Sequence, residues 1–100
     1  MAPRIIWSPI AERDINDIYT YIAHDSKKHA ITFIYRLSTV INNLKDNPEI
    51  GRLIPKYKNM FLREKIWGKY RIIYKMSAEK IVIITIIHGA RRLRIKSTDL

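Results

Sequence analysis

An apolar run near the C-terminus, IVIITII at residues 81–87, constrains the fold of this chain more than any other feature. Both of its faces are apolar, and a strand of that kind has to be covered by other parts of the protein on each side. Residues 80–88 should therefore form a central strand of a sheet. A chain of 100 residues is long enough for one hydrophobic core around such a strand, so we expect a single domain over residues 1–100.

Two further strands precede this run. Residues 61–66 and 69–77 have the β-branched and aromatic content of strands, and Gly68 marks the turn between them. The segment Ser77–Glu79 provides the second turn. Because both connections are short, the three strands should be antiparallel and joined as hairpins.

The first half of the chain has a helical period instead. After a short strand at residues 4–8, Ser8 and Pro9 are typical of a helix N-cap and first helical position. Ser26 can cap a second helix, which should end at Pro48. The apolar stripe of the first helix consists of Ala11, Ile15, Ile18 and Ile22.

The predicted order of elements is therefore β-α-α-β-β-β, an α+β fold with a mostly antiparallel, twisted sheet. The two helices should form a hairpin that packs on one face of that sheet. The other face is expected to be left for a partner.

All of the excess charge lies in the predicted strands and the segments around them. Residues 1–51 carry six Lys or Arg and six Asp or Glu, whereas residues 52–100 carry 13 and three, so the second half accounts for the net charge of +10. A basic surface on a folded domain favours an anionic partner such as nucleic acid, an acidic protein or a membrane surface. The absence of cysteine excludes disulfides and thiolate metal sites. With no membrane-length apolar run and no signal-peptide pattern, we expect a soluble, cytoplasmic protein.

Several basic residues in and after the strands are the candidates for function. Strand alternation places Arg63 with Lys65, and Arg71 with Lys75, on common faces. As an alternative, these are solvated charges that keep the sheet soluble and protect an edge from pairing. The residues we single out are Arg63, Lys65, Arg71, Lys75, Arg91 and Arg92.

His88 is the histidine nearest to these cations and the one candidate with a near-neutral reference pKa for proton transfer. The favoured alternative is a strand-end residue hydrogen-bonded to the backbone. His24 and His29 flank a helix break in poor ligand geometry, so neither a metal site nor a cofactor is expected. Glu64, the lone acid among the basic strands, is interpreted as an ion-pair partner of a neighbouring arginine.

Four segments in order, WSPIAERDINDIYTYIA, INNLKDNPEIGRLIP, LREKIWGKYRIIYKM and IIHGARR, make the chain similar to the RelE/ParE superfamily of toxins from bacterial type II toxin–antitoxin systems. The resemblance runs from about Ile5 to Arg92. It implies the β-αα-βββ fold and a small basic toxin that is neutralised by a cognate acidic antitoxin, with which it forms a hetero-oligomer. The L-R-E strand and the H-G-A-R ending are closer to ParE-like members, which poison DNA gyrase and need no catalytic residues.

The resemblance leaves a second target open, because RelE-like members cut mRNA on the ribosome. In that case Arg71 and Arg91 would hold the scissile phosphate, and His88 would act as acid or base. The tail RLRIKSTDL lacks the tyrosine that RelE-like enzymes place there, which favours gyrase. A plain basic nucleic-acid-binding module without toxicity is the third possibility.

The resemblance also indicates two contact surfaces. We expect a basic face to meet the target, and the antitoxin to lie against the helical hairpin and to pair with a sheet edge or cover the basic face. The target face is predicted at Arg63, Lys65, Lys75 and Arg92. The antitoxin contacts are predicted at Ile15, Ile18, Ile22, Leu37, Arg63, Lys65 and Arg91.

Overall fold

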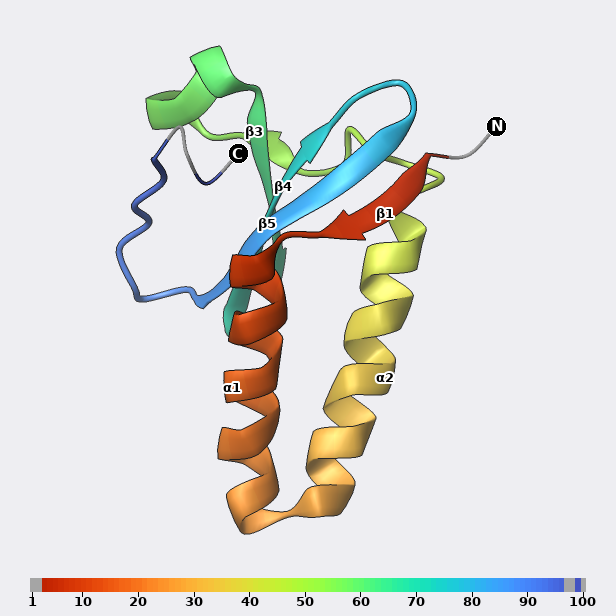
Figure 1. Cartoon of the computed structure of the whole chain (residues 1–100), viewed down its shortest axis with the longest axis vertical. Coiled ribbons are helices and arrows are strands. Elements are labelled where there is room, and N and C mark those ends of the chain that lie inside the picture. Colours follow the sequence, from red (N-terminus) through yellow and green to blue (C-terminus); the bar gives the residue numbers. More distant parts are fainter. Residues whose placement is uncertain (1–2, 97–98, 100) are drawn as a thin grey trace.

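The computed structural model describes residues 3–96 and 99, with all of their side chains except those of Lys58 and Asn59. Two helices follow the first strand, and the remaining strands follow the helices, as the sequence predicts (Figure 1). A two-residue strand and a short 3-10 helix in the connecting loop were not predicted. In chain order the elements are β1 (Arg4–Trp7), α1 (Pro9–Asp25), α2 (Lys27–Asn43), β2 (Arg52–Leu53), η1 (Pro55–Met60), β3 (Leu62–Trp67), β4 (Tyr70–Met76) and β5 (Lys80–His88).

The described strands form one mixed sheet in the order β1-β5-β4-β3-β2. β1 runs parallel to β5, and all the other pairs are antiparallel. β5 has a neighbour on each side, β1 and β4, so the apolar run at residues 81–87 forms an internal strand as predicted. The predicted α+β class and the β-α-α-β-β-β order are confirmed.

The helical hairpin lies on one face of the sheet, and its far end extends beyond the strands (Figure 1). Both helices begin as predicted. The Ser8 hydroxyl accepts a hydrogen bond from the Ala11 N–H at 3.0 Å, and the Ser26 hydroxyl accepts one from the His29 N–H at 3.1 Å. These caps satisfy N–H groups that have no partner inside the helix, so they fix where each helix starts.

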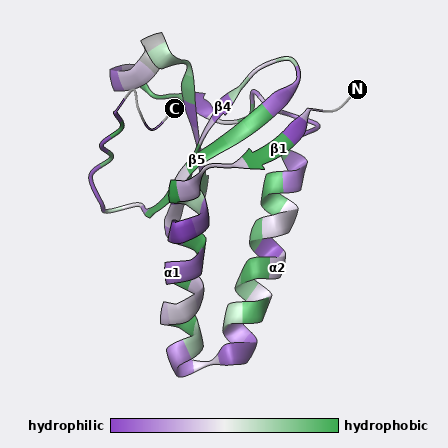
Figure 2. Cartoon of the chain, in the orientation of Figure 1, coloured by the Kyte–Doolittle hydropathy of each residue, from purple (hydrophilic) through white to green (hydrophobic). Residues whose placement is uncertain are grey.

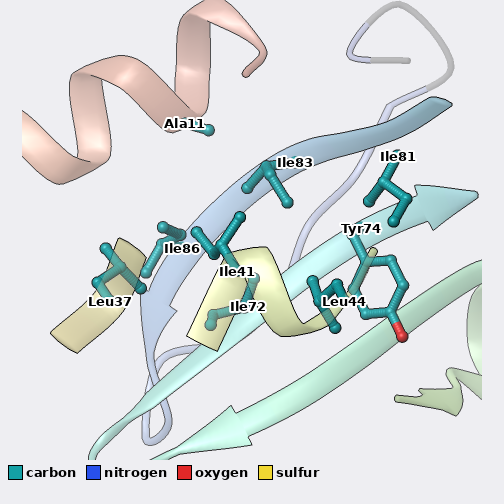
Figure 3. Packing of buried hydrophobic residues seen from close by; sticks show 9 residues of the cluster. All are labelled: Ala11, Leu37, Ile41, Leu44, Ile72, Tyr74, Ile81, Ile83 and Ile86. Carbon is teal, nitrogen blue, oxygen red and sulfur yellow. The ribbon is translucent and has the colours of Figure 1, made fainter. Parts of the chain in front are cut away.

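The main hydrophobic core fills the space between the hairpin and the sheet. Figure 3 shows Leu37 and Ile41 of α2, and Leu44 at its C-cap, reaching toward β4 and β5. Ala11 of α1 belongs to the same core and is completely buried. The strands contribute Ile72, Tyr74, Ile81, Ile83 and Ile86.

The opposite face of the sheet is also covered, which corrects the expectation that it is left for a partner. Tyr57 of η1 and Leu93, in the segment after β5, pack there on Ile73 and Ile84. A central strand that is apolar on both faces needs this second layer. Figure 2 shows the apolar character of β5 along most of its length.

A bulge in β5 changes which of its residues face the helices. Ile73 pairs with Thr85 and Tyr74 pairs with Ile83, so Ile84 is the extra residue. The side chains facing the hairpin are therefore Ile81 and Ile83 before the bulge and Ile86 after it.

α1 fastens onto this bulge through its first turns. The Ser8 hydroxyl donates a 2.6 Å hydrogen bond to the Ile84 carbonyl. The Asp14 carboxylate accepts hydrogen bonds from the Thr85 hydroxyl and, at 3.0 Å, from the Ile86 N–H. Polar groups freed by the bulge thus find partners in the helix rather than in the ladder.

Candidate functional site

A cleft of about 430 Å³ opens where β5 ends and α1 passes over it. Its size falls within the range of small-ligand sites, and its walls carry groups of both signs. His88 and Arg91, both singled out from the sequence, lie together here. The lining residues are Asp14, Asp17, Ile18, Tyr21, Lys69, Tyr70, Ile86, Ile87, His88 and Arg91.

The turn after β5 sets the positions of these two residues. The Arg91 N–H donates to the His88 carbonyl at 2.9 Å, and the Ala90 N–H donates to His88 Nδ1 at 3.3 Å. The imidazole also lies edge-on to the Tyr70 ring, with 6.0 Å between ring centroids. His88 is exposed, so solvent reaches both the ring and the arginine beside it.

Arg71 lies elsewhere. It pairs with Ile66 and Ile87 on the face of the sheet that carries Ile73, away from the helices. Its Nε and a terminal nitrogen donate to one oxygen of Glu64 at 3.0 and 2.6 Å. The cleft that brings His88 and Arg91 together does not include Arg71, so the three predicted catalytic residues are not assembled.

Glu64 is the centre of a two-arginine network, which confirms its interpretation as an ion-pair partner. The carboxylate is 3% exposed, and its second oxygen accepts a 3.0 Å hydrogen bond from Arg52 Nε. Burial by itself raises the pKa of Glu64, but the hydrogen bonds and positive charges of Arg71 and Arg52 outweigh burial and lower it below the ordinary value. Glu64 is therefore a fixed anion that orients two cations.

The predicted basic target face is divided between the two sides of the sheet. In the β3–β4 ladder Lys65 pairs with Ile72, whose side chain faces the helices, and Lys75 pairs with Leu62, which faces the opposite layer. Arg63 shares the side of Lys65, because it pairs with Tyr74. Arg92 lies after β5, so the four residues do not form one surface.

Arg63 is also engaged by the backbone. One of its terminal nitrogens donates to the Gly51 carbonyl at 2.8 Å and to the Glu49 carbonyl at 3.4 Å. These contacts hold the loop before β2 against the sheet. Arg63 therefore has a structural task that the sequence did not indicate.

Tyr74 ties down the same loop from the inside. Its hydroxyl donates to the Pro48 carbonyl at 2.7 Å and accepts from the Gly51 N–H at 2.9 Å. Burial raises the pKa of Tyr74, and the Gly51 hydrogen bond and the charge of Arg63 offset part of that rise. The N-P-x-x-G-R segment at residues 47–52 is thus a fold motif, in which Pro48 and Gly51 meet the tyrosine.

The residues predicted to meet the antitoxin differ in accessibility. Ile15 and Ile18 are partly buried and pack on the main core. Ile22 is partly buried beside a second cleft between the helices, where Phe33 and Trp67 also lie. Leu37 is completely buried, so the expectation that it contacts a partner is wrong: it belongs to the core.

Three residues that line the cleft were not among the candidates from the sequence: Asp17, Tyr21 and Lys69. Asp17 lies about one helical turn before Tyr21 on α1. The spacing of Asp14, Asp17 and Tyr21 on one side of α1 is a signal that could have indicated them, since residues three or four apart share a helix face. Lys69 lies in the β3–β4 turn, and only the tertiary fold brings it to the end of β5.

Across residues 3–96 and 99, no three potential ligands among His, Asp and Glu gather as a metal site would require. No helix within the described part of the chain is long and apolar enough to span a bilayer.

Comparison with known proteins connects this fold to a family. No curated protein matches the chain. A solved structure of the chromosomal ParDE toxin–antitoxin system from P. aeruginosa is similar, with a TM-score of 0.67 and 18% sequence identity over 87% of this chain and 96% of that chain. At this identity the likeness shows the fold. The family model of the ParE toxin of the type II toxin–antitoxin system parDE matches residues 5–93. The chain therefore belongs to the ParE family of type II toxins.

Proposed function

We propose that this toxin acts in the cytoplasm by poisoning DNA gyrase and that a cognate acidic antitoxin neutralises it. The observation that carries the proposal is the match to the ParE family over residues 5–93. The confinement of the net charge of +10 to residues 52–100 supports it, because a gyrase–DNA complex and an acidic antitoxin are both anionic partners.

The arrangement of the candidate catalytic residues argues against ribosome-dependent mRNA cleavage. Such cleavage needs cations that converge on one phosphate. Arg71 is 19% exposed and has two nitrogens on the Glu64 carboxylate, on the far side of the sheet from the hairpin. His88 and Arg91 line a different site. Gyrase poisoning does not require cations that converge on one phosphate, so it agrees better with the separation of Arg71 from His88 and Arg91.

The direct test is a gyrase assay with the purified protein. We expect inhibition of supercoiling or accumulation of cleaved DNA, and both effects should disappear when the cognate antitoxin is added first. The matched assay is mRNA cleavage on programmed ribosomes, where intact message is expected. Ribosome-dependent cleavage that Arg71→Ala or Arg91→Ala abolishes would establish the RelE-like activity instead.

Growth provides the cellular counterpart. Expression of the toxin without its partner should arrest a bacterial host, and co-expression of the antitoxin should restore growth. A variant with Arg91→Ala and Arg92→Ala tests whether the basic segment after β5 contributes. Unimpaired growth with verified folded protein would contradict an active toxin.

A further inference from the structure

The segment that follows β5, residues 91–96, alternates between buried and exposed side chains. Leu93 is 8% exposed and Ile95 is partly buried, and both pack on the face of the sheet opposite the hairpin. Arg92, Arg94 and Lys96 are exposed. We call this segment the C-terminal strap; Figure 1 shows it running beside the sheet toward η1.

Tyr57 of η1 fastens the strap. Its hydroxyl donates to the Leu93 carbonyl at 3.4 Å and accepts from the Ile95 N–H at 3.1 Å. Together with the apolar contacts of Leu93 and Ile95, these bonds hold the backbone in place on a buried surface. The outward cations are thus carried on an anchored chain rather than on a free tail.

Within residues 3–96 and 99, no ion pair involves a cation of the strap. The ion pairs among these residues are those of Glu64 with Arg52 and Arg71. The nearby Asp99 carboxylate accepts a 2.9 Å hydrogen bond from the Lys96 N–H, and neither of the ion pairs among the described residues includes it. Unpaired, regularly presented positive charge is available to an external anion.

We propose that the C-terminal strap binds the phosphate backbone of duplex DNA, through Arg92, Arg94 and Lys96 with Arg91 at its start. This inference rests on the proposed function, because it identifies the DNA held by gyrase as a direct contact of the toxin. Guanidinium groups suit phosphate, since they can donate two parallel hydrogen bonds to it.

The surface character of the strap distinguishes DNA from an acidic protein as the partner. Protein interfaces are organised around a buried apolar or aromatic centre. The strap turns its apolar residues inward, and none of the large exposed hydrophobic side chains belongs to it. DNA interfaces are instead polar and strongly positive, as this segment is.

Salt dependence of DNA binding tests the inference. Binding of the full chain to a short labelled duplex is measured by fluorescence anisotropy between roughly 50 and 200 mM salt. Each phosphate contact adds about 0.9 to the slope of log K against log salt. The variant Arg92→Gln/Arg94→Gln/Lys96→Gln should therefore lower the slope by about 2.7 and weaken binding at low salt at least tenfold.

A matched variant controls for net charge. Lys27→Gln/Lys28→Gln/Arg36→Gln removes the same charge from exposed positions of α2, remote from the strap. We expect it to lower the slope by less than about 1. Equal effects of the two variants, or an unchanged slope in the strap variant, would overturn the inference. Circular dichroism and thermal melting confirm that both proteins are folded.

Two further arms separate the alternatives. If the strap variant loses affinity for a poly-glutamate peptide but not for DNA, the strap is a docking site for an acidic protein and the inference is wrong. Tyr57→Phe keeps every charge but loosens the strap, so it should weaken DNA binding several-fold with the slope retained. If Tyr57→Phe binds DNA with wild-type affinity, the Tyr57 hydroxyl does not hold the strap in its DNA-binding position.

Gyrase inhibition measured on the same preparations distinguishes this inference from the proposed function. If the toxin inhibits gyrase but its DNA binding does not depend on the strap, the inference about the strap is wrong and the proposed function stands. If DNA binding depends on the strap but gyrase is not inhibited, the strap is a DNA-binding segment and the proposed target is wrong.

Discussion

Single residues in this protein show how polar groups are placed inside a small sheet. Glu64 is buried between two arginines, and Tyr74 is buried beneath a loop whose backbone it bonds. No buried polar side-chain atom in the described part of the chain lacks a hydrogen-bond partner. Because an unpaired buried group would cost about 1–3 kcal/mol, each of these contacts is a site where substitution has a measurable effect.

Gly51 is the first such site. A Cβ at this position would lie 2.6 Å from the Tyr74 hydroxyl oxygen and 2.7 Å from the Glu64 carbonyl oxygen, both held in place by the fold. We expect Gly51→Ala to lower the free energy of unfolding by about 3 kcal/mol, measured by urea denaturation.

Gly68→Ala is the comparison for that experiment. Gly68 has a φ of +56° but no atom within 4 Å of the added methyl group, so only backbone strain of about 1 kcal/mol should appear. Equal losses in the two variants would mean that the loop before β2 moves freely enough to accept the methyl group.

Glu64 predicts a dependence of stability on pH. Its pKa is lowered in the folded protein, so it adds stability at pH values above the ordinary 4.5 and loses that contribution as the pH falls through the folded pKa. Glu64→Gln should lower the free energy of unfolding by on the order of 2 kcal/mol at neutral pH, because Arg71 then loses its charged partner.

The difference between wild type and Glu64→Gln should shrink as the pH is lowered below 4.5. Parallel urea titrations from neutral to acidic pH measure it. A constant difference across that range would contradict the ionised state assigned to Glu64.

At the scale of elements, the connection between α1 and β5 determines how the hairpin sits on the sheet. Ser8, the N-cap of α1, and Asp14, six residues further along the chain, both hold the bulge of β5. The Ala11 side chain lies between them and is completely buried, which lets the helix approach the strand closely. Each specified residue type after Pro9 in the S-P-x-A-x-x-D pattern, like Ser8 itself, thus has a contact inside the fold.

Asp14→Ala should release this connection. The Thr85 hydroxyl and the Ile86 N–H would each lose their acceptor, so we expect a loss of about 2 kcal/mol in the free energy of unfolding. Hydrogen exchange at the Ile86 amide should accelerate as well. Asp17→Ala, at an exposed position of the same helix, serves as control and should leave both quantities nearly unchanged.

Elements defined by local sequence were predicted well, and those defined by tertiary contact were not. The caps at Ser8 and Ser26 and the alternation of β4 depend on neighbouring residues, so the sequence indicates them directly. β2 is two residues long and exists only because β3 pairs with it. The strap leaves no periodic signal long enough to separate it from a loop.

The same limit applies to the candidate site. His88 and Arg91 are three residues apart, so their proximity follows from the chain, and the structure places both in one cleft. Arg71 does not join them, and its pairing with Glu64 depends on the register between β3 and β4, which the sequence does not specify. Arg63 looked like a free surface cation, because backbone carbonyls as partners cannot be predicted from side-chain identity.

For the whole molecule, the separation of charge predicts how an acidic partner approaches. The net charge of +10 in residues 52–100 should attract an acidic antitoxin over a distance of about one Debye length. We expect the association rate to fall markedly between low and physiological salt. The dissociation rate should change much less, because we predict that apolar contacts with the hairpin determine it.

Charge reversal can assign this steering to particular residues. Lys65→Glu and Arg91→Glu should slow association, as measured by stopped-flow mixing with the antitoxin, and leave dissociation nearly unchanged. Arg63→Glu should instead destabilise the fold, because Arg63 bonds the Gly51 carbonyl. An association rate that is insensitive to salt and to both reversals would exclude the basic half as the docking surface.

The parallel pairing of β1 with β5 has a consequence for synthesis of the protein. Ser8 bonds Ile84, which is 76 residues further along the chain, and Arg4 pairs with Lys80. During translation the N-terminal strand and both helices emerge long before the strand that they must join. Contacts of such high sequence separation form slowly, and domains complete folding only when all of their strands are available. A growing chain therefore cannot assemble its sheet until the codons of β5 have been read, and an antitoxin that is already present has that interval in which to meet it.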